Sequence, residues 1–357
     1  MTATAAGLEG VVAFETAIAE PDRDGGALRY RGVDVEDLVG RVPFERVWAL
    51  LVDGDPSRAL PPEPAERAAR TGDPRADLQA ALAGLAPRWG LPPLLDRDEA
   101  GARDDLARAS AAALALAADA GRAPGAPALP EREVAGGSTA AERFLLRLRG
   151  EASDRSARAL DAYWVTAAEH GANASTFTAR IVASTGADAA AALSAAVGAL
   201  SGPLHGGAPA RVLAMLDGVE AEGDAHRWVD RALARGERIM GFGHRVYRAE
   251  DPRARVLRRA ARELNAPRLQ VAEALEAAAL AALAERKPDR VLATNVEFWS
   301  AVVLDVAGLP ASLFTALFAC GRTAGWSAHV LEQHREGRLI RPAAAYVGEG
   351  PRALPEA

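Results

Sequence analysis

Three of the six histidines in this chain lie in short segments that also carry glycine, where a packed core would gain little from an imidazole. They are His170 in EHGANAST, His205 in GPLHGG and His244 in GFGHR. A fourth segment, NVEFW, places Glu297 among apolar residues. Titratable side chains on turn-rich backbone suit acid–base chemistry on a small molecule, because glycine lets a ligand approach the main chain closely. These four residues are therefore candidate site residues.

Two of these residues have a purely structural interpretation that is about as good. His205 follows a predicted helix and would be well placed to cap its last carbonyl groups. Glu297 lies two residues after Asn295, a good helix N-cap, so its carboxylate would stabilise the helix dipole. In the functional alternative, burial raises the pKa of Glu297 and favours a general base. The local sequence leaves both alternatives open.

A dense group of arginines follows His244. Six arginines fall within fifteen residues, at positions 245, 248, 253, 255, 258 and 259. They predict either a solvated helix face or a site for carboxylate or phosphate groups, which the planar guanidinium binds well. Further along, Arg322 lies seven residues before His329 with Trp326 between them, so the three share one face of a helix. Taken alone, Arg322 and Arg341 would be interpreted as surface residues.

The elements that must position these residues are mostly helices, because alanine abounds and aromatic residues make up only 5% of the chain. Apolar residues at 44, 47, 48 and 51 follow helical spacing after Pro43, and Gly54 ends that helix. Residues 10–18 suggest a short strand or hairpin, and the proline-rich stretch 55–75 suggests a surface connection with short helical pieces. The other predicted helices are 99–121, 141–149, 156–168, 188–200, 225–234, 253–264, 269–285, 312–321 and 326–335.

The length of 357 residues is enough for two domains. The histidine-bearing loops flank and enter the segment 208–309, which we expect to be a smaller helical domain. Residues 1–207 and 310–357 would then form one large, discontinuous helical domain. The expected fold class is therefore all-α, with an inserted domain.

Bulk properties argue against several classes of protein. The net charge of −6 disfavours nucleic acid or an anionic membrane as the main partner. Cys320 is the only cysteine, so a disulfide within the chain and a thiolate-rich metal site are excluded. A zinc motif is also missing, since His329 and His334 are five residues apart. No signal peptide or membrane-spanning run is evident, and we expect a cytoplasmic protein without a metal.

In their order and spacing, the four segments resemble the citrate synthase family. Arg322, Arg341 and the early segment GVDVEDL at 32–38 extend the similarity. The resemblance is strong over 164–347, fair over 10–54 and poor between them. It implies a nearly all-helical homodimer, with a large domain built from both chain ends and a small inserted domain. It also implies that no metal or redox cofactor takes part.

The resemblance further implies a reaction in which acetyl-CoA condenses with oxaloacetate, through a thioester enolate, to give citrate and CoA. In this reaction His205 would hydrogen-bond the thioester oxygen, His244 would polarise the ketone of oxaloacetate, and Glu297 would remove the methyl proton. The residues implied in binding the substrates are His170, Arg253 and Arg322 for the carboxylates of oxaloacetate, Arg341 of the partner subunit for the same ligand, and Arg248 for a phosphate of CoA.

The chain departs from the family at Glu297, where aspartate is usual. The extra methylene moves the carboxylate by about one bond length, and a misplacement of about 1 Å can cost roughly 10²-fold in rate. A second departure is the segment 56–137, which lacks the family's usual sequence, so the resemblance does not assign the local CoA contacts there.

Three rival functions remain at the level of sequence. The first is a 2-methylcitrate synthase that uses propionyl-CoA, because one methylene gives only about 1–3 kcal/mol of discrimination. The second is a weakened or non-catalytic binding protein of the same fold, which the departure at Glu297 keeps open. The third, a nucleic-acid-binding module that uses the arginines, is disfavoured because aromatic interleaving and a basic overall charge are missing.

Overall fold

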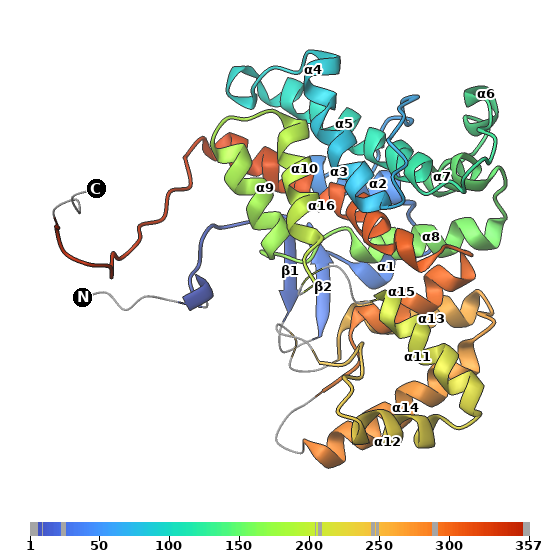
Figure 1. The fold of residues 1–357 in the computed structure, drawn as a ribbon. Helices are drawn as coiled ribbons and strands as arrows, with labels where there is room; N and C mark the ends of the chain where they lie inside the picture. The colour runs from blue at the N-terminus through green and yellow to red at the C-terminus, as the bar shows by residue number, and fades with distance from the viewer. Residues whose placement is uncertain are drawn as a thin grey trace, which may run out of the picture.

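The structure is a computed structural model, and it describes residues 6–8, 10–22, 26–203, 205, 209–243, 247, 250–287 and 292–352. Helices dominate, which confirms the all-α prediction (Figure 1). The helices of the first half are α1 (Val35–Leu38), α2 (Phe44–Asp53), α3 (Pro74–Ala83), α4 (Leu85–Trp89), α5 (Glu99–Ala120), α6 (Glu131–Val134), α7 (Ala140–Arg149) and α8 (Asp154–Ala167). Those of the second half are α9 (Ala174–Ser184), α10 (Ala189–Leu200), α11 (Pro209–Glu222), α12 (Ala225–Ala234), α13 (Pro252–Glu263), α14 (Leu269–Arg286), α15 (Val296–Val306) and α16 (Phe314–Glu336).

Local signals set many of the helix ends. Helix α2 ends at Gly54, whose φ of 72° is the left-handed conformation that glycine adopts at little cost. Asp98, Asn173 and Asn295 each accept a hydrogen bond from a main-chain N–H in the first turn of α5, α9 and α15. Such caps satisfy amide groups that would otherwise lack a partner. Two of these helices, α9 and α15, therefore begin inside the candidate segments of His170 and Glu297.

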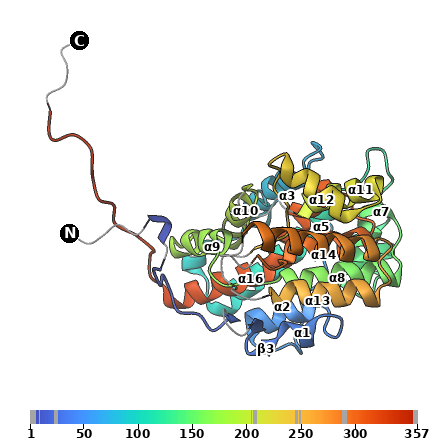
Figure 2. The ribbon, with the colours of Figure 1, turned by 90° about the horizontal axis from the view of Figure 1, so that it is seen from below.

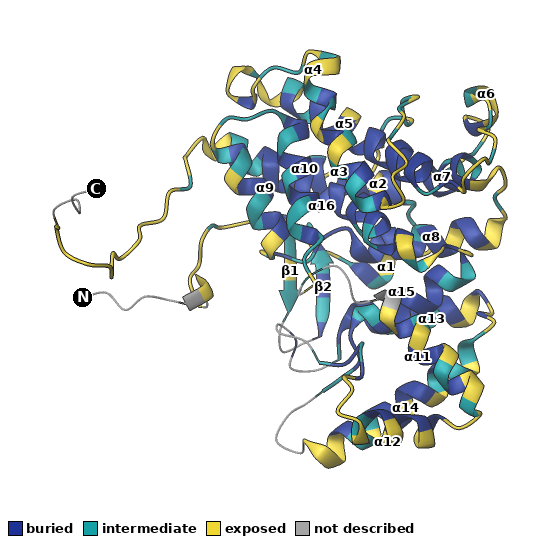
Figure 3. Cartoon of the chain, in the orientation of Figure 1, coloured by how far each residue is buried: buried dark blue, intermediate teal, exposed yellow. Residues whose placement is uncertain are grey.

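Helix α16 is the centre of the molecule, and its middle is buried against α2, α5, α8, α9 and α10 (Figure 3). Two of its glycines permit close packing with the end of α8. A Cβ atom at Gly321 would meet Trp164 at 3.2 Å, and one at Gly325 would meet the carbonyl oxygen of Ala168 at 2.6 Å. Side chains at these positions would push the two helices apart, so the glycines bring α16 against the segment that carries His170.

The structure corrects three predictions. Residues 312–321 and 326–335 are not two helices but parts of the single helix α16, because tertiary packing offsets the low helix propensity of its glycines. The stretch 55–73 contains no helix, so the predicted short helical pieces there are wrong. The predicted strand at 10–18 is also wrong, since the first strand begins at Ala19. The helices that the pattern analysis did not predict are α1, α3, α4, α6, α9 and α11.

A small antiparallel sheet lies beside the middle of the molecule (Figure 1). It is formed by β1 (Ala19–Asp22), β2 (Ala27–Tyr30) and β3 (Val33–Asp34). Three 3-10 turns, at Ala6–Leu8, Leu94–Asp96 and Ala311–Leu313, complete the regular structure of the described residues. At the end of β2, the buried hydroxyl of Tyr30 lies within hydrogen-bond distance of the carbonyl oxygens of Val165, Thr166 and Glu169, at 3.1–3.2 Å. The sheet is thereby tied to the segment before His170.

Helices α11, α12 and α14 gather at one end of the molecule, away from α3 to α7 (Figure 1). Helices α13 and α15 pack against each other and against α8, and so join this end to the rest. The chain ends leave the helical body on one side, where most of residues 10–17 and 338–352 is exposed (Figures 2 and 3). Within the described residues, no helix is both long and apolar enough to cross a lipid bilayer.

Candidate active site

His205 lies five residues after α10 and turns its ring toward the start of α9. Its Nε2 lies 3.0 Å from the Oγ atom of Ser175. Ser175 is fully buried in the first turn of α9, next to the capping residue Asn173. The side chain of His205 thus contacts a neighbouring helix and not a carbonyl group of α10, which contradicts the capping interpretation.

The His205 imidazole is held neutral. Burial lowers its pKa to about 4, and the nearby charge of Arg322 acts in the same direction. At neutral pH the ring therefore carries one proton, on either Nδ1 or Nε2. A neutral imidazole can donate a hydrogen bond to a substrate oxygen without bringing a full charge into the site.

Ser175 connects this ring to α16. Its Oγ atom accepts a hydrogen bond from Nε1 of Trp326 at 3.2 Å and donates one to Oδ1 of Asn173 at 2.8 Å. Because an amide oxygen can only accept, the serine hydroxyl proton goes to Asn173. The contact between Oγ and Nε2 of His205 at 3.0 Å then orients the His205 ring relative to α9 and α16.

Glu297 occupies the first turn of α15. Its main-chain N–H donates to Oδ1 of Asn295 at 3.0 Å, so the predicted helix cap is present. Asn295 also donates through Nδ2 to the carbonyl oxygen of Gly243 at 2.9 Å, and Phe242 forms an antiparallel bridge with Thr294. The cap therefore fixes the start of α15 beside the segment that leads into position 244. Capping and a functional position are compatible here.

The pKa of the Glu297 carboxyl is higher than that of an exposed glutamate. Burial raises its pKa to about 6, while the charges of Arg253 and Arg238 oppose this rise. Most of the carboxyl is ionised at neutral pH, yet it holds a proton far better than an exposed glutamate does. This combination is the one expected of a general base.

Asp251 brings Arg253 to the same place. It caps α13 and accepts hydrogen bonds from Nε and Nη2 of Arg253 at 3.0 and 2.9 Å. Its Oδ2 atom also accepts from the N–H of Val296, the first residue of α15, at 3.0 Å. One buried carboxylate thus joins the starts of α13 and α15, and with them Arg253 and Glu297.

Arg322 is buried on α16, contrary to the surface position suggested by its sequence context alone. Its Nε donates to the carbonyl oxygen of Ala167 at 2.8 Å, and its guanidinium lies 4.9 Å from the ring centre of Phe318. Burial lowers its pKa, the charge of Glu169 opposes this, and Arg253 is close enough to repel it. A second cation is therefore held near His205 and Arg253.

His170 lies just beyond α8, with its Nε2 3.0 Å from the hydroxyl of Tyr247. The next residue, Gly171, has a φ of 65°, and a Cβ there would touch Pro21 of β1 at 3.4 Å. A side chain at this position would be strained as well as crowded. The small sheet and Tyr247 thus enclose His170 from two sides.

The remaining predicted arginines lie in different settings: some form ion pairs within the fold, and Arg341 is exposed. Arg255 and Arg259 pair with Glu36, and Arg258 pairs with Glu276, so ion pairing within the fold accounts for these three. Arg341 is exposed on the C-terminal segment. His244, Arg245 and Arg248 lie outside the described residues.

Sequence reasoning gave too little weight to four buried side chains at this site. None of Ser175, Tyr30, Tyr247 and Glu169 was assigned a role from the sequence. Tyr247 lies four residues before a capped helix and Glu169 directly before His170, which are weak signals. No group of three or more histidine, cysteine or acidic residues that could hold a metal occurs in the part of the chain that the structure describes.

Comparison with known proteins places these residues in a wider context. The family model described as "Citrate synthase, C-terminal domain" matches residues 7–343. A Mycobacterium tuberculosis protein named "Putative citrate synthase 2" is 64% identical over 349 residues, covering 97% of this chain and 94% of the relative. The Haloferax volcanii "Citrate synthase" is 35% identical, covering 96% of this chain and 95% of its own length. A "2-methylcitrate synthase" of Shewanella oneidensis is 33% identical, covering 98% and 96%.

Solved structures agree with this assignment. Citrate synthase from Thermoplasma acidophilum, solved as a ternary complex, superposes with a TM-score of 0.82 at 29% identity, covering 98% of this chain and 97% of that one. The ligands named for that complex are carboxymethyl coenzyme A and oxaloacetate. Citrate synthase from Thermotoga maritima gives a TM-score of 0.77 at 30% identity, covering 98% of this chain and 97% of that one.

Proposed function

The chain belongs to the citrate synthase family, and from this premise we propose that it condenses acetyl-CoA with oxaloacetate to give citrate and CoA. The observation that carries the proposal is the combination of a neutral His205 and a Glu297 of raised pKa with two buried arginines, Arg253 and Arg322. A weak carbon acid needs a base and a donor for the developing oxyanion. A dianionic keto acid needs matched positive charge.

In the first step, the carboxylate of Glu297 removes a proton from the methyl group of acetyl-CoA. His205 donates a hydrogen bond to the thioester oxygen as negative charge develops there, and the contact of Ser175 with Nε2 holds the ring in its orientation. One such donor is worth about 2.7–4 kcal/mol in other enzymes. The enolate carbon then attacks the ketone of oxaloacetate, which His244 polarises, and water hydrolyses the thioester to release CoA.

Oxaloacetate binds through its two carboxylates. Arg253 and Arg322 supply buried guanidinium groups, and His170 adds a hydrogen-bond donor. Arg341 of a second subunit completes the set, and Arg248 contacts a phosphate of CoA. Buried cations bind a dianion strongly because little solvent screening separates the charges.

Glu297 is one methylene longer than the aspartate usual in the family. We propose that the Asn295 cap compensates, since its bonds to Gly243 and to the N–H of Glu297 fix where α15 begins. The rate then depends on this cap as well as on the carboxylate.

Propionyl-CoA is the alternative acyl donor. Relatives named 2-methylcitrate synthase are 33% and 34% identical to this chain, which is nearly the identity of those named citrate synthase. A single methylene changes the binding free energy by only about 1–3 kcal/mol. We expect both donors to react, with acetyl-CoA preferred.

We further propose a cytoplasmic homodimer whose small domain, residues 208–309, closes over the substrates, while 1–207 and 310–357 form the large domain. Support for the dimer comes from the exposed apolar residues on the chain ends, Val12, Leu339, Tyr346 and Val347. Packing them against a second subunit would remove apolar surface from water and bring Arg341 to the partner's site.

The test is release of free thiol from acetyl-CoA and from propionyl-CoA, each with oxaloacetate. We expect Glu297→Gln to abolish turnover while oxaloacetate still binds, because the amide cannot accept the proton. Glu285→Gln, on the exposed end of α14, is the matched control and should retain turnover. Full turnover by Glu297→Gln would remove Glu297 from the role of base. No thiol release by a folded wild-type dimer would instead favour a binding protein.

A further inference from the structure

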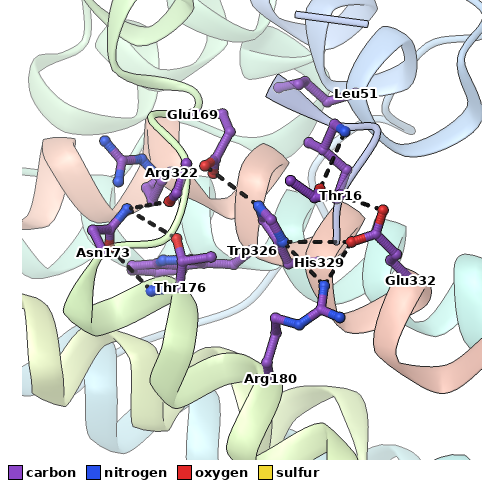
Figure 4. Close-up of polar contacts among 12 residues, drawn as sticks. Thr16, Leu51, Glu169, Asn173, Thr176, Arg180, Arg322, Trp326, His329 and Glu332 are labelled. Atoms are coloured by element: carbon purple, nitrogen blue, oxygen red, sulfur yellow. Dashed lines mark hydrogen bonds and ion pairs between the residues drawn. The ribbon is translucent and has the colours of Figure 1, made fainter. Parts of the chain in front are cut away.

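A chain of buried charges lies behind the proposed oxaloacetate site and takes no part in the chemistry above (Figure 4). Its inner member is Glu169, whose side chain is fully buried. Neither of its carboxylate oxygens has a standard hydrogen bond with a described residue. Nε2 of His329 lies closest, 3.4 Å from Oε1. Burying a carboxylate is costly unless an opposite charge faces it.

The other ring nitrogen of His329 faces an arginine. Nδ1 lies 3.3 Å from Nη1 of Arg180, which is itself fully buried. Arg180 donates to Glu332 at 2.6 Å and to Glu336 at 2.8 Å, and the ring of Phe14 covers its guanidinium at 3.9 Å. His329 is therefore held between Glu169 on the inside and Arg180 on the outside (Figure 4). The outermost partner of Arg180, Glu336, is partly exposed to solvent.

The backbone around Glu169 is attached to α16 at successive points. Arg322 donates from Nε to the carbonyl oxygen of Ala167 at 2.8 Å. The N–H of Gly325 donates to the carbonyl oxygen of Ala168 at 3.1 Å. His329 then faces the side chain of Glu169. Three groups on one face of α16 thus contact three consecutive residues, and the next residue is His170.

Gly325 leaves room for the carboxylate. A Cβ atom there would lie 1.9 Å from Oε2 of Glu169, so the carboxylate occupies the space that any other side chain on α16 would fill. Burial alone would raise the pKa of Glu169, but His329 and then Arg322 outweigh burial and lower it. The group is therefore an anion that faces a cation of the proposed substrate site.

We propose that Glu169 and His329 are a positioning pair for oxaloacetate: together they fix the segment 167–170 against α16, so that His170 and Arg322 stay in place to bind the dianion. The inference rests on the proposed function. It assigns no contact with substrate to either residue. Arg180 and Glu332 hold the outer side of His329 and so set its orientation.

The pair also has a purely structural alternative, in which it only stabilises the fold. That role predicts a loss of stability without a selective change in the binding of one substrate. A positioning role predicts a rise in KM for oxaloacetate and a much smaller change in KM for acetyl-CoA, because His170 and Arg322 are expected to contact only oxaloacetate.

The experiment measures both KM values, kcat and the melting temperature for Glu169→Gln, His329→Gln and the double variant. Removing one partner of a buried charge pair is costly, so each single variant should raise KM for oxaloacetate about tenfold to a hundredfold. KM for acetyl-CoA should change less than about threefold. The double variant should be no worse than the worse single variant, because residues that act as a unit are not additive.

Glu63→Gln is the matched control. Glu63 is also a buried carboxylate, and it pairs with Arg143 at 2.6 Å on α7, away from the site. This variant should lower stability without changing either KM. Glu332→Gln disturbs the outer end of the network more mildly and should raise KM for oxaloacetate by a few-fold. This variant replaces the inner ones in the test if they do not fold.

The possible outcomes distinguish the positioning role from a purely structural one and from failure of the proposed function. Folded, active variants with the wild-type KM for oxaloacetate overturn the inference, as do equal rises in both KM values. A wild-type protein that neither releases thiol nor binds oxaloacetate overturns the proposed function and, with it, this inference. A selective rise in the variants but not in Glu63→Gln supports the positioning pair.

Discussion

The pKa of Glu297 gives a quantitative prediction for the pH dependence of the reaction. With a pKa of about 6, roughly nine-tenths of the carboxyl is ionised at pH 7 and roughly one-tenth at pH 5. The base acts only when ionised, so kcat/KM should fall roughly tenfold between these two pH values. A carboxyl with the ordinary pKa of 4.5 would lose only about a quarter of its ionised form over the same range.

His205 does not disturb this prediction, because its pKa of about 4 leaves the ring mostly neutral at pH 5. The assay is thiol release between pH 5 and 8 at constant ionic strength, with kcat/KM as the readout since it reports the free enzyme. Samples returned from pH 5 to pH 7 should regain full activity, which controls for unfolding.

Arg238 allows the electrostatic origin of this pKa to be tested. Its charge lowers the pKa of Glu297, so Arg238→Gln should move the acid limb upward by a few tenths of a pH unit. Arg238 is exposed, and the difference from wild type should shrink at high salt. Arg235→Gln is the control, because this exposed arginine pairs with Glu237 and does not act on Glu297. An acid limb near pH 4.5, or one that Arg238→Gln shifts downward, would refute the reasoning.

Two further substitutions test the packing around the site. Gly325→Ala should destabilise the protein by about 1–3 kcal/mol or more in chemical denaturation and weaken oxaloacetate binding, because its Cβ would meet Glu169 at 1.9 Å. Gly84→Ala, whose Cβ would have only ordinary contacts at 3.5 Å and whose φ is −77°, should change stability little; equal effects would contradict this account. Ser175→Ala should lower kcat about tenfold, because the buried N–H of Trp326 loses its acceptor and His205 loses the partner that orients its ring. An unchanged kcat would show that Ser175 does not orient His205 for the reaction.

Local sequence signals account for much of the fold. The helical spacing after Pro43, the stop at Gly54 and the caps at Asn173 and Asn295 are all present in the structure. Each depends on residues within one or two turns of one another, so tertiary contacts are not needed to recognise it. The prediction failed where distant contacts outweighed local propensity, as at Gly325, where close packing against Glu169 and Ala168 keeps α16 continuous.

The sequence by itself determined the types of group available: imidazoles and a carboxylate beside glycine, and more arginines than one substrate needs. Only the tertiary structure decided which of them work together. It buried Arg253 and Arg322, paired Arg255 and Arg259 with Glu36, and set Ser175 beside His205. The physical reason is that a pKa or the strength of an ion pair depends on burial and on neighbours hundreds of residues away, which a local pattern does not contain.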